Sequence, residues 1–340
     1  MAGLVWQNNQ WEGGNIRMAK ERRTVVALVS LAGLMWSWSA FALDGQTLPG
    51  TWTMKSPIST VRAEVAAIAI DGRLHALGGV VDGRSAPSHD EYDPIGNTWR
   101  SRAPLLEPRD HLAVATANGK IYAFGGFGTP VHKDASSKAF EYDPITDAWR
   151  VLPPMKVPRG AAGAATVDGR IHVIGGRGLD GVVVGAHEIF DTKSGTWSEA
   201  LALPMARDHL AVITVDGKIH LIGGRFKGSA DPTAAHDVYD PATSKWTSAA
   251  PLPTPRSGLA SAYYHGLILV LGGELPPDHT FPENEAYDPK ADQWKALSPM
   301  PHGRHGFGGD VIGDSAYFVG GSLTPGDAKA TDQLLMFHLP

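Results

Sequence analysis

The chain of 340 residues contains no cysteine. This absence excludes disulfide bonds, a cysteine nucleophile and a tyrosine–cysteine redox cofactor. Charged residues are also few, at 19 %, and no segment with helical periodicity is long enough to form a helical domain. The apolar stretch Thr24–Met35 is too short for a comfortable membrane span. Glycine is abundant, with 40 residues, and this composition is typical of a turn-dense all-β protein.

The sequence also lacks the local motifs of several enzyme classes. It has no Walker loop, no dinucleotide-binding glycine fingerprint, and no His-Glu-x-x-His or Gly-x-Ser-x-Gly element in a suitable context. Residues 43–340 carry 26 Lys and Arg against 33 Asp and Glu, a net charge of about −7. An acidic balance argues against nucleic acid as a partner. We expect no cofactor.

What the chain does contain is a repeat with a period of 47 to 50 residues. Adjacent glycines recur six times, each pair at the end of an apolar run: Gly78-Gly79, Gly125-Gly126, Gly175-Gly176, Gly223-Gly224, Gly272-Gly273 and Gly320-Gly321. An arginine stands sixteen residues before each pair, at Arg62, Arg109, Arg159, Arg207, Arg256 and Arg304. A tryptophan stands ten residues before each arginine, from Trp52 to Trp294. A period of this length indicates repeated supersecondary units.

Each unit divides into four expected strands, named a to d here. Strands a and b are apolar runs, joined in the first four units by Asn-Gly or Asp-Gly, as at Asn118-Gly119, which is the strongest short-range hairpin signal. Strand c ends at an aromatic–Asp step such as Tyr92-Asp93, where the following proline favours a turn. Strand d carries the tryptophan. All variation in length lies in the connection between strands b and c.

The glycine pairs, the Tyr-Asp-Pro steps at 92–94, 142–144, 239–241 and 287–289, and the spaced tryptophans resemble the kelch motif over nearly all of the chain after residue 50. The resemblance implies four-stranded blades of a β-propeller. The last unit lacks a tryptophan strand, whereas Gly50–Thr53 precedes the first arginine without a blade of its own. We therefore predict an all-β, six-bladed kelch-type propeller over residues 43–340, closed by the N-terminal strand, which completes the last blade.

Residues 1–42 are expected to lie outside the propeller. A basic segment with Lys20, Arg22 and Arg23 precedes the apolar stretch, and the small-residue site Ala40-Phe41-Ala42 follows it. This order is typical of a signal peptide. We interpret residues 18–42 as a signal peptide cleaved between Ala42 and Leu43, and residues 1–17 as an upstream extension. The protein is then exported, periplasmic or secreted, and no stable membrane anchor is expected.

The b–c and d–a connections of a blade emerge on one face of a propeller, named the loop face here. Function concentrates on variable loops held by a rigid frame, so we predict the site on this face, at the mouth of the central channel. The six arginines recur as regularly as the glycines. Their expected role is to hydrogen-bond backbone carbonyls of the blades, and direct contact with a ligand is the alternative.

Residues that break the repeat are the better functional candidates. The candidate ligand-binding residues are Arg159, Arg177, Arg207 and Arg225, which we expect to form a cationic lobe, together with Arg109, Asp110 and Asp208. The candidate acid–base groups are Glu64, Glu274, His111, His209 and His305. Glu64, His111 and His209 also have the composition of a two-His-one-carboxylate metal site. They belong to blades one, two and four, and we predict no metal.

Other histidines and three phenylalanines carry weaker signals. His75, His172 and His220 occupy the strand-b position that Tyr122 and Tyr317 fill in other units, so we expect them to be packing residues. The histidines expected in variable loops, and therefore solvated, are His132, His187, His236 and His279. Phe127, Phe226 and Phe281 lie in b–c connections, where exposed aromatic side chains would indicate a protein-binding face.

Three functions are compatible with these observations. The leading hypothesis is a non-catalytic module that binds a protein, peptide or glycan with anionic groups on the loop face. The second is a sugar mutarotase, because the chain is similar in architecture, export and cationic face to the sialic-acid epimerase family of exported kelch proteins. Its regular blades without large insertions depart from that family. The third is a structural or assembly role. An enzyme would show a deep pocket with a titratable pair, whereas a binding module would show a broad face with exposed aromatics.

Overall fold

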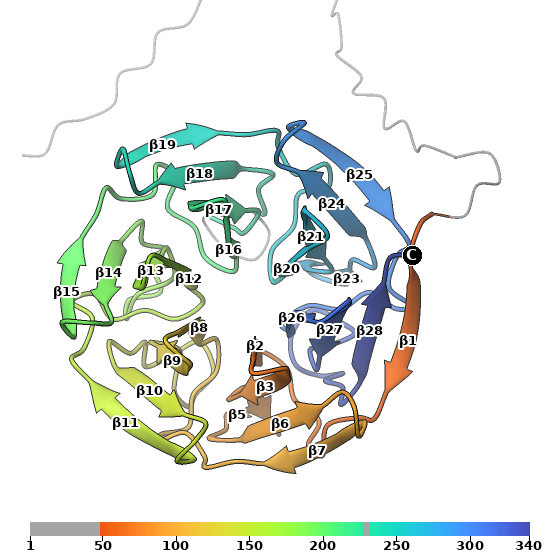
Figure 1. Ribbon diagram of the computed structural model, residues 1–340, viewed down its shortest axis with the longest axis horizontal. Helices are drawn as coiled ribbons and strands as arrows, with labels where there is room; N and C mark the ends of the chain where they lie inside the picture. Colours follow the sequence, from red (N-terminus) through yellow and green to blue (C-terminus); the bar gives the residue numbers. More distant parts are fainter. Residues whose placement is uncertain (1–47, 227–230) are drawn as a thin grey trace, which may run out of the picture. The chain divides into compact units, whose positions relative to one another are not determined.

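The computed structural model describes residues 48–226 and 231–340, and all regular elements in these ranges are β-strands. They form six four-stranded antiparallel sheets arranged as the blades of a ring (Figure 1). The predicted six-bladed propeller is therefore confirmed. Over the same ranges no helix has the length and apolar character required to cross a bilayer. The predicted signal peptide and upstream extension lie outside the described residues.

The blades follow the order of the chain, with strand a nearest the channel. Blade one contains β2 (Ala66–Ile70), β3 (Arg73–Leu77), β6 (His89–Asp93) and β7 (Thr98–Ser101). Blade two contains β8 (Ala113–Ala117), β9 (Lys120–Phe124), β10 (Ala139–Asp143) and β11 (Ala148–Leu152). Blade three contains β12 (Gly163–Val167), β13 (Arg170–Ile174), β14 (His187–Asp191) and β15 (Thr196–Glu199).

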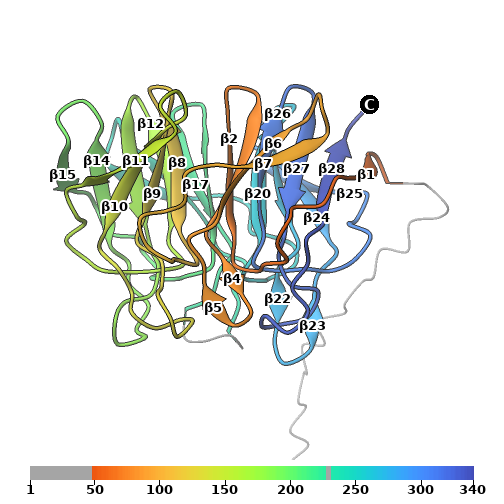
Figure 2. The ribbon, with the colours of Figure 1, turned by 90° about the horizontal axis from the view of Figure 1, so that it is seen from below.

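The second half of the ring repeats this pattern. Blade four contains β16 (Ala211–Val215), β17 (Lys218–Ile222), β18 (His236–Asp240) and β19 (Lys245–Ser248). Blade five contains β20 (Ala260–Tyr264), β21 (Leu267–Leu271), β24 (Asn284–Asp288) and β25 (Gln293–Leu297). Blade six contains β26 (Gly308–Ile312), β27 (Ser315–Val319), β28 (Leu334–His338) and β1 (Thr51–Lys55). Two short hairpins, β4 (Val80–Val81) with β5 (Arg84–Ser85) and β22 (Glu274–Leu275) with β23 (His279–Thr280), extend the loop face (Figure 2).

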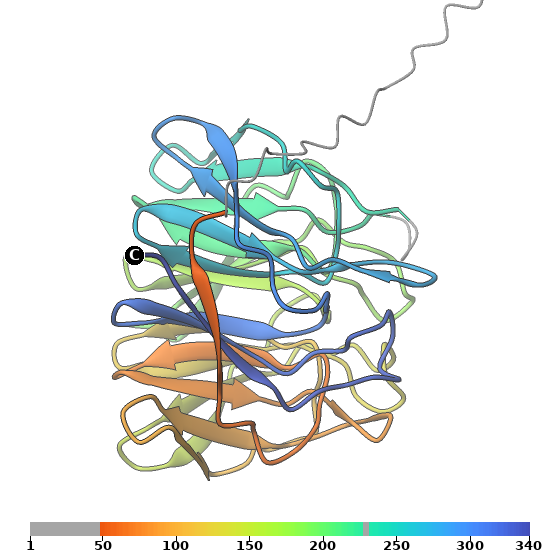
Figure 3. The ribbon, with the colours of Figure 1, turned by 90° about the vertical axis from the view of Figure 1, so that its right-hand side faces the viewer.

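The N-terminal strand closes the ring as predicted. β1 runs antiparallel to β28, from Thr51 opposite His338 to Lys55 opposite Leu334 (Figure 3). The indole nitrogen of Trp52 donates a hydrogen bond to the Ser298 carbonyl of blade five at 2.9 Å. The other tryptophans of strand d make the same contact with the preceding blade, at Trp99, Trp149, Trp197, Trp246 and Trp294. Trp52 therefore completes blade six in the way that strand d completes the others.

The glycine pairs permit a close approach between neighbouring blades. A Cβ atom on Gly125 would lie 2.2 Å from the carbonyl oxygen of Arg159, which no side chain tolerates. The amide of Gly126 donates to that same carbonyl at 3.1 Å. Each pair thus joins its blade to the arginine-bearing segment of the next one, and the hydrophobic core is divided into clusters between adjacent blades.

Most of the recurring arginines belong to this framework. Five of the six, Arg62, Arg159, Arg207, Arg256 and Arg304, have no exposed surface. Arg159 Nη2 donates to the carbonyl oxygen of Val173 at 3.1 Å, and its Nη1 pairs with Glu188. Arg207, Arg256 and Arg304 also donate to strand-b or glycine-pair carbonyls of their own blades. The expected hydrogen bonds to backbone carbonyls are therefore present.

Three histidine pairs cross from strand b to strand c. The Nδ1–Nε2 distances are 2.9 Å for His75–His89, 2.8 Å for His172–His187 and 2.9 Å for His220–His236. The packing role expected for the strand-b histidines is confirmed, since all three are buried. The expectation that His187 and His236 are solvated loop residues is wrong, because β14 and β18 begin at these residues and bury them.

Candidate functional site

One backbone position gathers the site residues at the channel mouth, two residues after each recurring arginine. All six residues at this position have positive φ: Glu64, His111, Ala161, His209, Gly258 and Gly306. Hydrogen bonds join these backbones in order around the channel, with the His111 amide donating to the Glu64 carbonyl at 3.2 Å, and the Val65 amide closes the circle by donating to the Gly306 carbonyl at 3.3 Å. Left-handed backbone is uncommon for glutamate. The positive φ of Glu64 therefore makes it a candidate functional residue.

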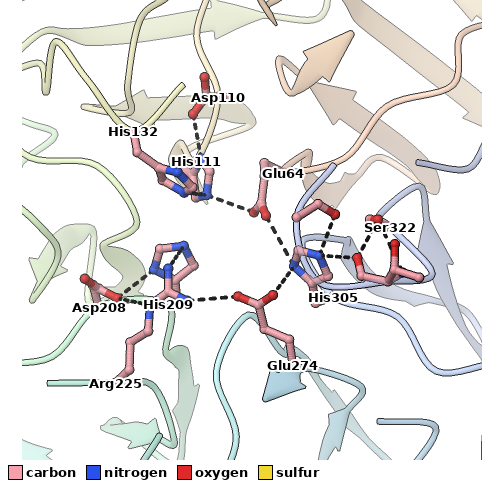
Figure 4. A network of polar contacts seen from close by, with 12 residues as sticks. Glu64, Asp110, His111, His132, Asp208, His209, Arg225, Glu274, His305 and Ser322 are labelled. Carbon is pink, nitrogen blue, oxygen red and sulfur yellow. Dashed lines mark hydrogen bonds and ion pairs between the residues drawn. The ribbon is translucent and has the colours of Figure 1, made fainter. Parts of the chain in front are cut away.

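The acid–base candidates meet in one polar network (Figure 4). Glu64 lies 3.0 Å from His111 Nε2 and 3.3 Å from His305 Nδ1. His305 Nδ1 is also 3.5 Å from a Glu274 oxygen, and Glu274 accepts a hydrogen bond from Arg225 at 2.8 Å. His209 joins through Arg225, whose Nη2 lies 3.0 Å from His209 Nε2. The structure thus brings together all five residues that the sequence offered as acid–base groups.

Two aspartates support the histidines of this network. Asp110 accepts a hydrogen bond from His111 Nδ1 at 2.5 Å, and Asp208 accepts one from His209 Nδ1 at 2.7 Å. Asp208 also accepts bonds from Arg177 Nε at 2.7 Å and Arg225 Nε at 3.0 Å. Each aspartate directly precedes the histidine that it orients, so the Asp-His steps of blades two and four make equivalent pairs.

The pKa values of the histidines in the network are shifted in opposite directions. Burial disfavours the charged form of His111, but Glu64 and Asp110 outweigh it and raise its pKa to about 10. The pKa of His305 rises to about 9 against the same burial, chiefly through Glu64. Burial, reinforced by Arg225, lowers the pKa of His209 to about 4. Despite burial, His111 and His305 hold the pKa of Glu64 well below its usual range.

The predicted cationic lobe is wrong. Arg159 and Arg207 are wholly buried against Glu188 and Asp237 inside their blades and do not reach the channel. The remaining two arginines of the lobe, Arg177 and Arg225, share the carboxylate of Asp208, and Arg225 also pairs with Glu274. Arg109 pairs with Glu107 at 2.7 Å and Asp134 at 3.3 Å. An acidic partner brought in by the fold therefore compensates each arginine of the candidate set.

Sequence reasoning missed two residues of the network. His132, expected to be solvated, is exposed on the b–c connection of blade two but places its Nε2 3.1 Å from His111 Nε2. Asp327, in the b–c connection of blade six, has its pKa raised to about 6 by burial and by the charge of Glu64. Both lie in the connections of variable length, where the repeat supplies no register, so no sequence pattern indicates them.

The space enclosed at the network is small. A cavity of about 120 Å³ lies beneath it, lined by Glu64, His111, His209 and residues that lead into the a strands. A second cavity of about 470 Å³ occupies the channel, and its lining includes the polar side chains of Thr116, Thr166, Thr214, Ser261 and Asp310. Pockets for small organic ligands usually measure about 300–1,000 Å³. The titratable groups therefore close the loop-face end of the channel and line a cavity below that range.

Exposed apolar side chains lie on the loop face over blades three to five, and Val61 and Leu106 are also exposed in the d–a connections that enter blades one and two. Leu179 and Val182 belong to the b–c connection of blade three, and Met205 to the segment that enters blade four. Phe226 and Leu275 follow in the b–c connections of blades four and five. Large exposed apolar groups on one face are typical of an interaction surface. We name the five residues over blades three to five the apolar arc.

The expectation of exposed aromatic side chains on this face is wrong for two of its three residues. Phe127 and Phe281 are buried, whereas Phe226 is 37 % exposed. Phe127 packs with Ala135 and Ala161 under the b–c connection of blade two, and Phe281 contacts the buried guanidinium of Arg256. These aromatic rings stabilise the loops instead of presenting a surface.

The geometry defines the class of protein as a kelch-type propeller with a polar network at the channel mouth. The model of the KLHDC2/KLHL20/DRC7 Kelch-repeats domain matches residues 111–321, which is more than half of the chain. The chain therefore belongs to this kelch-repeat family, whose propellers generally serve as protein-binding scaffolds. Among solved structures it is similar to the structure of YjhT, with a TM-score of 0.71 and 17 % identity over 83 % of this chain and 96 % of that one. No curated protein sequence matches it.

Proposed function

We propose that this kelch propeller is an exported binding module that holds a protein or peptide on its loop face, over blades three to five. The observation that carries the proposal is the apolar arc. Its members are well exposed, from 37 % for Phe226 and Leu275 to 64 % for Leu179. They stand on connections that the rigid ring holds in place, which is the usual arrangement of binding residues.

The same observation bears on the chemistry of the partner. An apolar surface favours a protein or peptide over an acidic glycan, because burial of apolar area drives association. A preference for anionic groups rests on Arg177 alone, since its side chain is 17 % exposed while that of Arg225 is buried. An acidic side chain of the partner is expected to contact Arg177 at the inner edge of the arc. The channel cavity of about 470 Å³ has the size of a small-ligand pocket, but none of the five acid–base candidates lines it.

Photo-crosslinking tests the position of the partner. A photoreactive amino acid is placed at Leu179 or Leu275 on the loop face, in cells that produce the protein naturally. Ile145 is the matched control, because it is 90 % exposed but lies in a c–d turn on the opposite face. We expect adducts of discrete mass from Leu179 and Leu275 and none from Ile145.

The apolar arc is expected to provide the affinity as well as the location. Replacing both Leu179 and Val182 with aspartate should lower the crosslinking yield at Leu275 about 30-fold, the effect of losing roughly 2 kcal/mol at an interface hot spot. The fold should survive because both side chains are exposed. Equal adducts from Ile145, or an undiminished yield from the double variant, would show that the arc is not the binding surface.

Export is a separate part of the proposal, supported by the basic, apolar and small-residue order of residues 18–42. Mass spectrometry of the protein isolated from the periplasm or medium is expected to find a chain that starts at Leu43. A mature chain that retains Thr24–Met35 would instead indicate an anchored protein.

A further inference from the structure

Three imidazole groups meet at the loop-face end of the channel (Figure 4). Ring nitrogens of His111, His132 and His209 all lie within 4.8 Å of one another. The Nε2 atoms of His111 and His132 are 3.1 Å apart. Two nitrogens bound to one tetrahedral ion at about 2.0–2.1 Å lie roughly 3.3 Å from each other, so this pair has the separation of neighbouring metal ligands. The imidazole of His209 must move closer to complete the set, since the three nitrogens lie within 4.8 Å of one another.

The buried members of the trio are held from behind by carboxylates. Asp110 and Asp208 accept the Nδ1 protons of His111 and His209, at 2.5 Å and 2.7 Å. The Nε2 atom of each ring is directed into the cluster, and His111 releases the Nε2 proton that it shares with Glu64 when an ion binds. A carboxylate on the far nitrogen is the usual support of a metal-binding histidine, because it sets the tautomer and the orientation of the ring.

The aspartates are themselves fixed in place. Asp110 accepts a hydrogen bond from Ser85 Oγ at 2.6 Å. Asp208 is bound by Arg177 at 2.7 Å and Arg225 at 3.0 Å. Both aspartates are buried. The residues that orient the two histidines are therefore themselves held by hydrogen bonds, as is usual for the groups behind metal ligands.

Of the two groups that contact the inward nitrogens, Glu64 fits a bound cation, whereas an ion must displace the bond from Arg225 to His209. Glu64 lies 3.0 Å from His111 Nε2, which places its carboxylate beside the position of an ion. Arg225 donates to His209 Nε2 at 3.0 Å, and it keeps its bonds to Asp208 and Glu274 when an ion displaces this one. The carboxylates of Glu64, Asp110, Asp208, Glu274 and Asp327 outnumber the guanidinium groups of Arg177 and Arg225 around the cluster. This excess of acidic groups favours a bound cation.

We propose that His111, His132 and His209 bind one divalent transition-metal ion at the mouth of the channel, with Glu64 as the carboxylate ligand. Three imidazole nitrogens and one carboxylate oxygen form a ligand set for Zn²⁺ that also accepts Co²⁺ and Ni²⁺. The cavity of about 120 Å³ next to these side chains has room for a water molecule on the ion. The site is independent of the apolar arc and does not depend on the proposed partner.

Metal titration of the purified protein tests the site. After treatment with a chelator, the protein is titrated with Zn²⁺ by calorimetry and with Co²⁺ by visible absorption. We expect one ion per chain, the intense absorption of tetrahedral Co²⁺, and a higher melting temperature with Zn²⁺. His132→Ala removes a ligand from an exposed loop and leaves the ring intact. It is expected to weaken Zn²⁺ binding more than about 100-fold, since even the loss of a supporting group costs about 10–100-fold.

His279→Ala is the matched control. His279 is also exposed on the loop face, in the b–c hairpin of blade five, and it does not belong to the histidine cluster. This variant should bind Zn²⁺ as tightly as the parent, and both variants should melt at the parent temperature without metal. The proposal is overturned if the parent takes up no Zn²⁺ or Co²⁺ at one equivalent. It is also overturned if His132→Ala binds as well as the parent, or if His279→Ala loses as much affinity.

Discussion

A chain that begins at Ser56, and therefore lacks β1, is expected to melt at least about 10 °C below the parent and to aggregate. Without β1, the five residues of β28 from Leu334 to His338 become an exposed edge that pairs with other chains. The ring of Trp52, whose centroid lies 4.8 Å from that of Phe337, leaves with the strand. Losing a packed tryptophan alone costs about 3–5 kcal/mol, a large part of the roughly 5–15 kcal/mol that holds a domain folded.

Calorimetry and size-exclusion chromatography compare this chain with one that begins at Leu48. The longer chain keeps β1 and the contacts of Leu48 and Pro49 with Ser298, so its melting temperature should equal that of the chain from Leu43. Trp52→Ala and Trp99→Ala should destabilise the ring equally, because both indoles bond to the preceding blade. A monomeric chain from Ser56 with an unchanged melting temperature would refute closure of the ring as a source of stability.

The second large effect is a loss of stability on mild acidification, caused by the three buried histidine pairs. Burial lowers the pKa values of all six residues to about 3 or 4: His75, His89, His172, His187, His220 and His236. In the unfolded chain the pKa of histidine is about 6.5. Between pH 6.5 and 4 the unfolded state therefore binds more protons than the native state, so stability falls as the pH falls.

The size of the effect follows from the same values. At pH 5 each neutral, buried histidine destabilises the native state by about 2 kcal/mol relative to neutral pH. Six such residues approach the whole stability of a typical domain, so we expect a steep decrease in the free energy of unfolding between pH 7 and pH 5. The lowered pKa values of His209 and His132 add to the decrease, whereas His111 and His305 have raised pKa values and act in the opposite direction, with a smaller effect in this interval.

Blade two supplies the matched variant for this test. In blade two, Tyr122 and Ala139 occupy the positions that His75 and His89 occupy in blade one. The double variant His75→Tyr with His89→Ala therefore gives blade one the residue pair of blade two. Denaturant unfolding of parent and variant is measured at pH 7 and pH 5. The variant should lose about one third less free energy than the parent on acidification. Equal losses in both proteins would show that the histidine pairs do not control the acid sensitivity.

The architecture was open to prediction from the sequence because its signals are local and repeated. An Asn-Gly step forms its turn with positive φ at both residues, as at Asn118 and Gly119, whatever lies elsewhere. The glycine pairs and tryptophans recur at constant spacing, so six agreeing registers determined the blades and their number. The orphan strand at Trp52 even indicated how the ring closes, since exposed edges are disfavoured.

The site was only partly predictable. The sequence determined which residues break the repeat, and these include Glu64, His111, His209, Glu274 and His305, which meet in one network. It did not show that Asp208 neutralises both Arg177 and Arg225, or that strand c buries His187 and His236. The expectation that these arginines form a cationic lobe was therefore wrong.

Only the tertiary structure decided these partnerships, because they join residues on different blades. Arg225 and Glu274 are 49 positions apart, and His111 and His209 lie in blades two and four. Their distances are determined by the radius of the ring and by the circle of left-handed residues at the channel mouth. His132 reaches the network from a b–c connection, and these connections vary in length between blades. The repeat therefore does not determine where a residue of such a connection lies. Local propensities specify the blade, whereas side-chain contacts across the channel exist only once all six blades have closed around it.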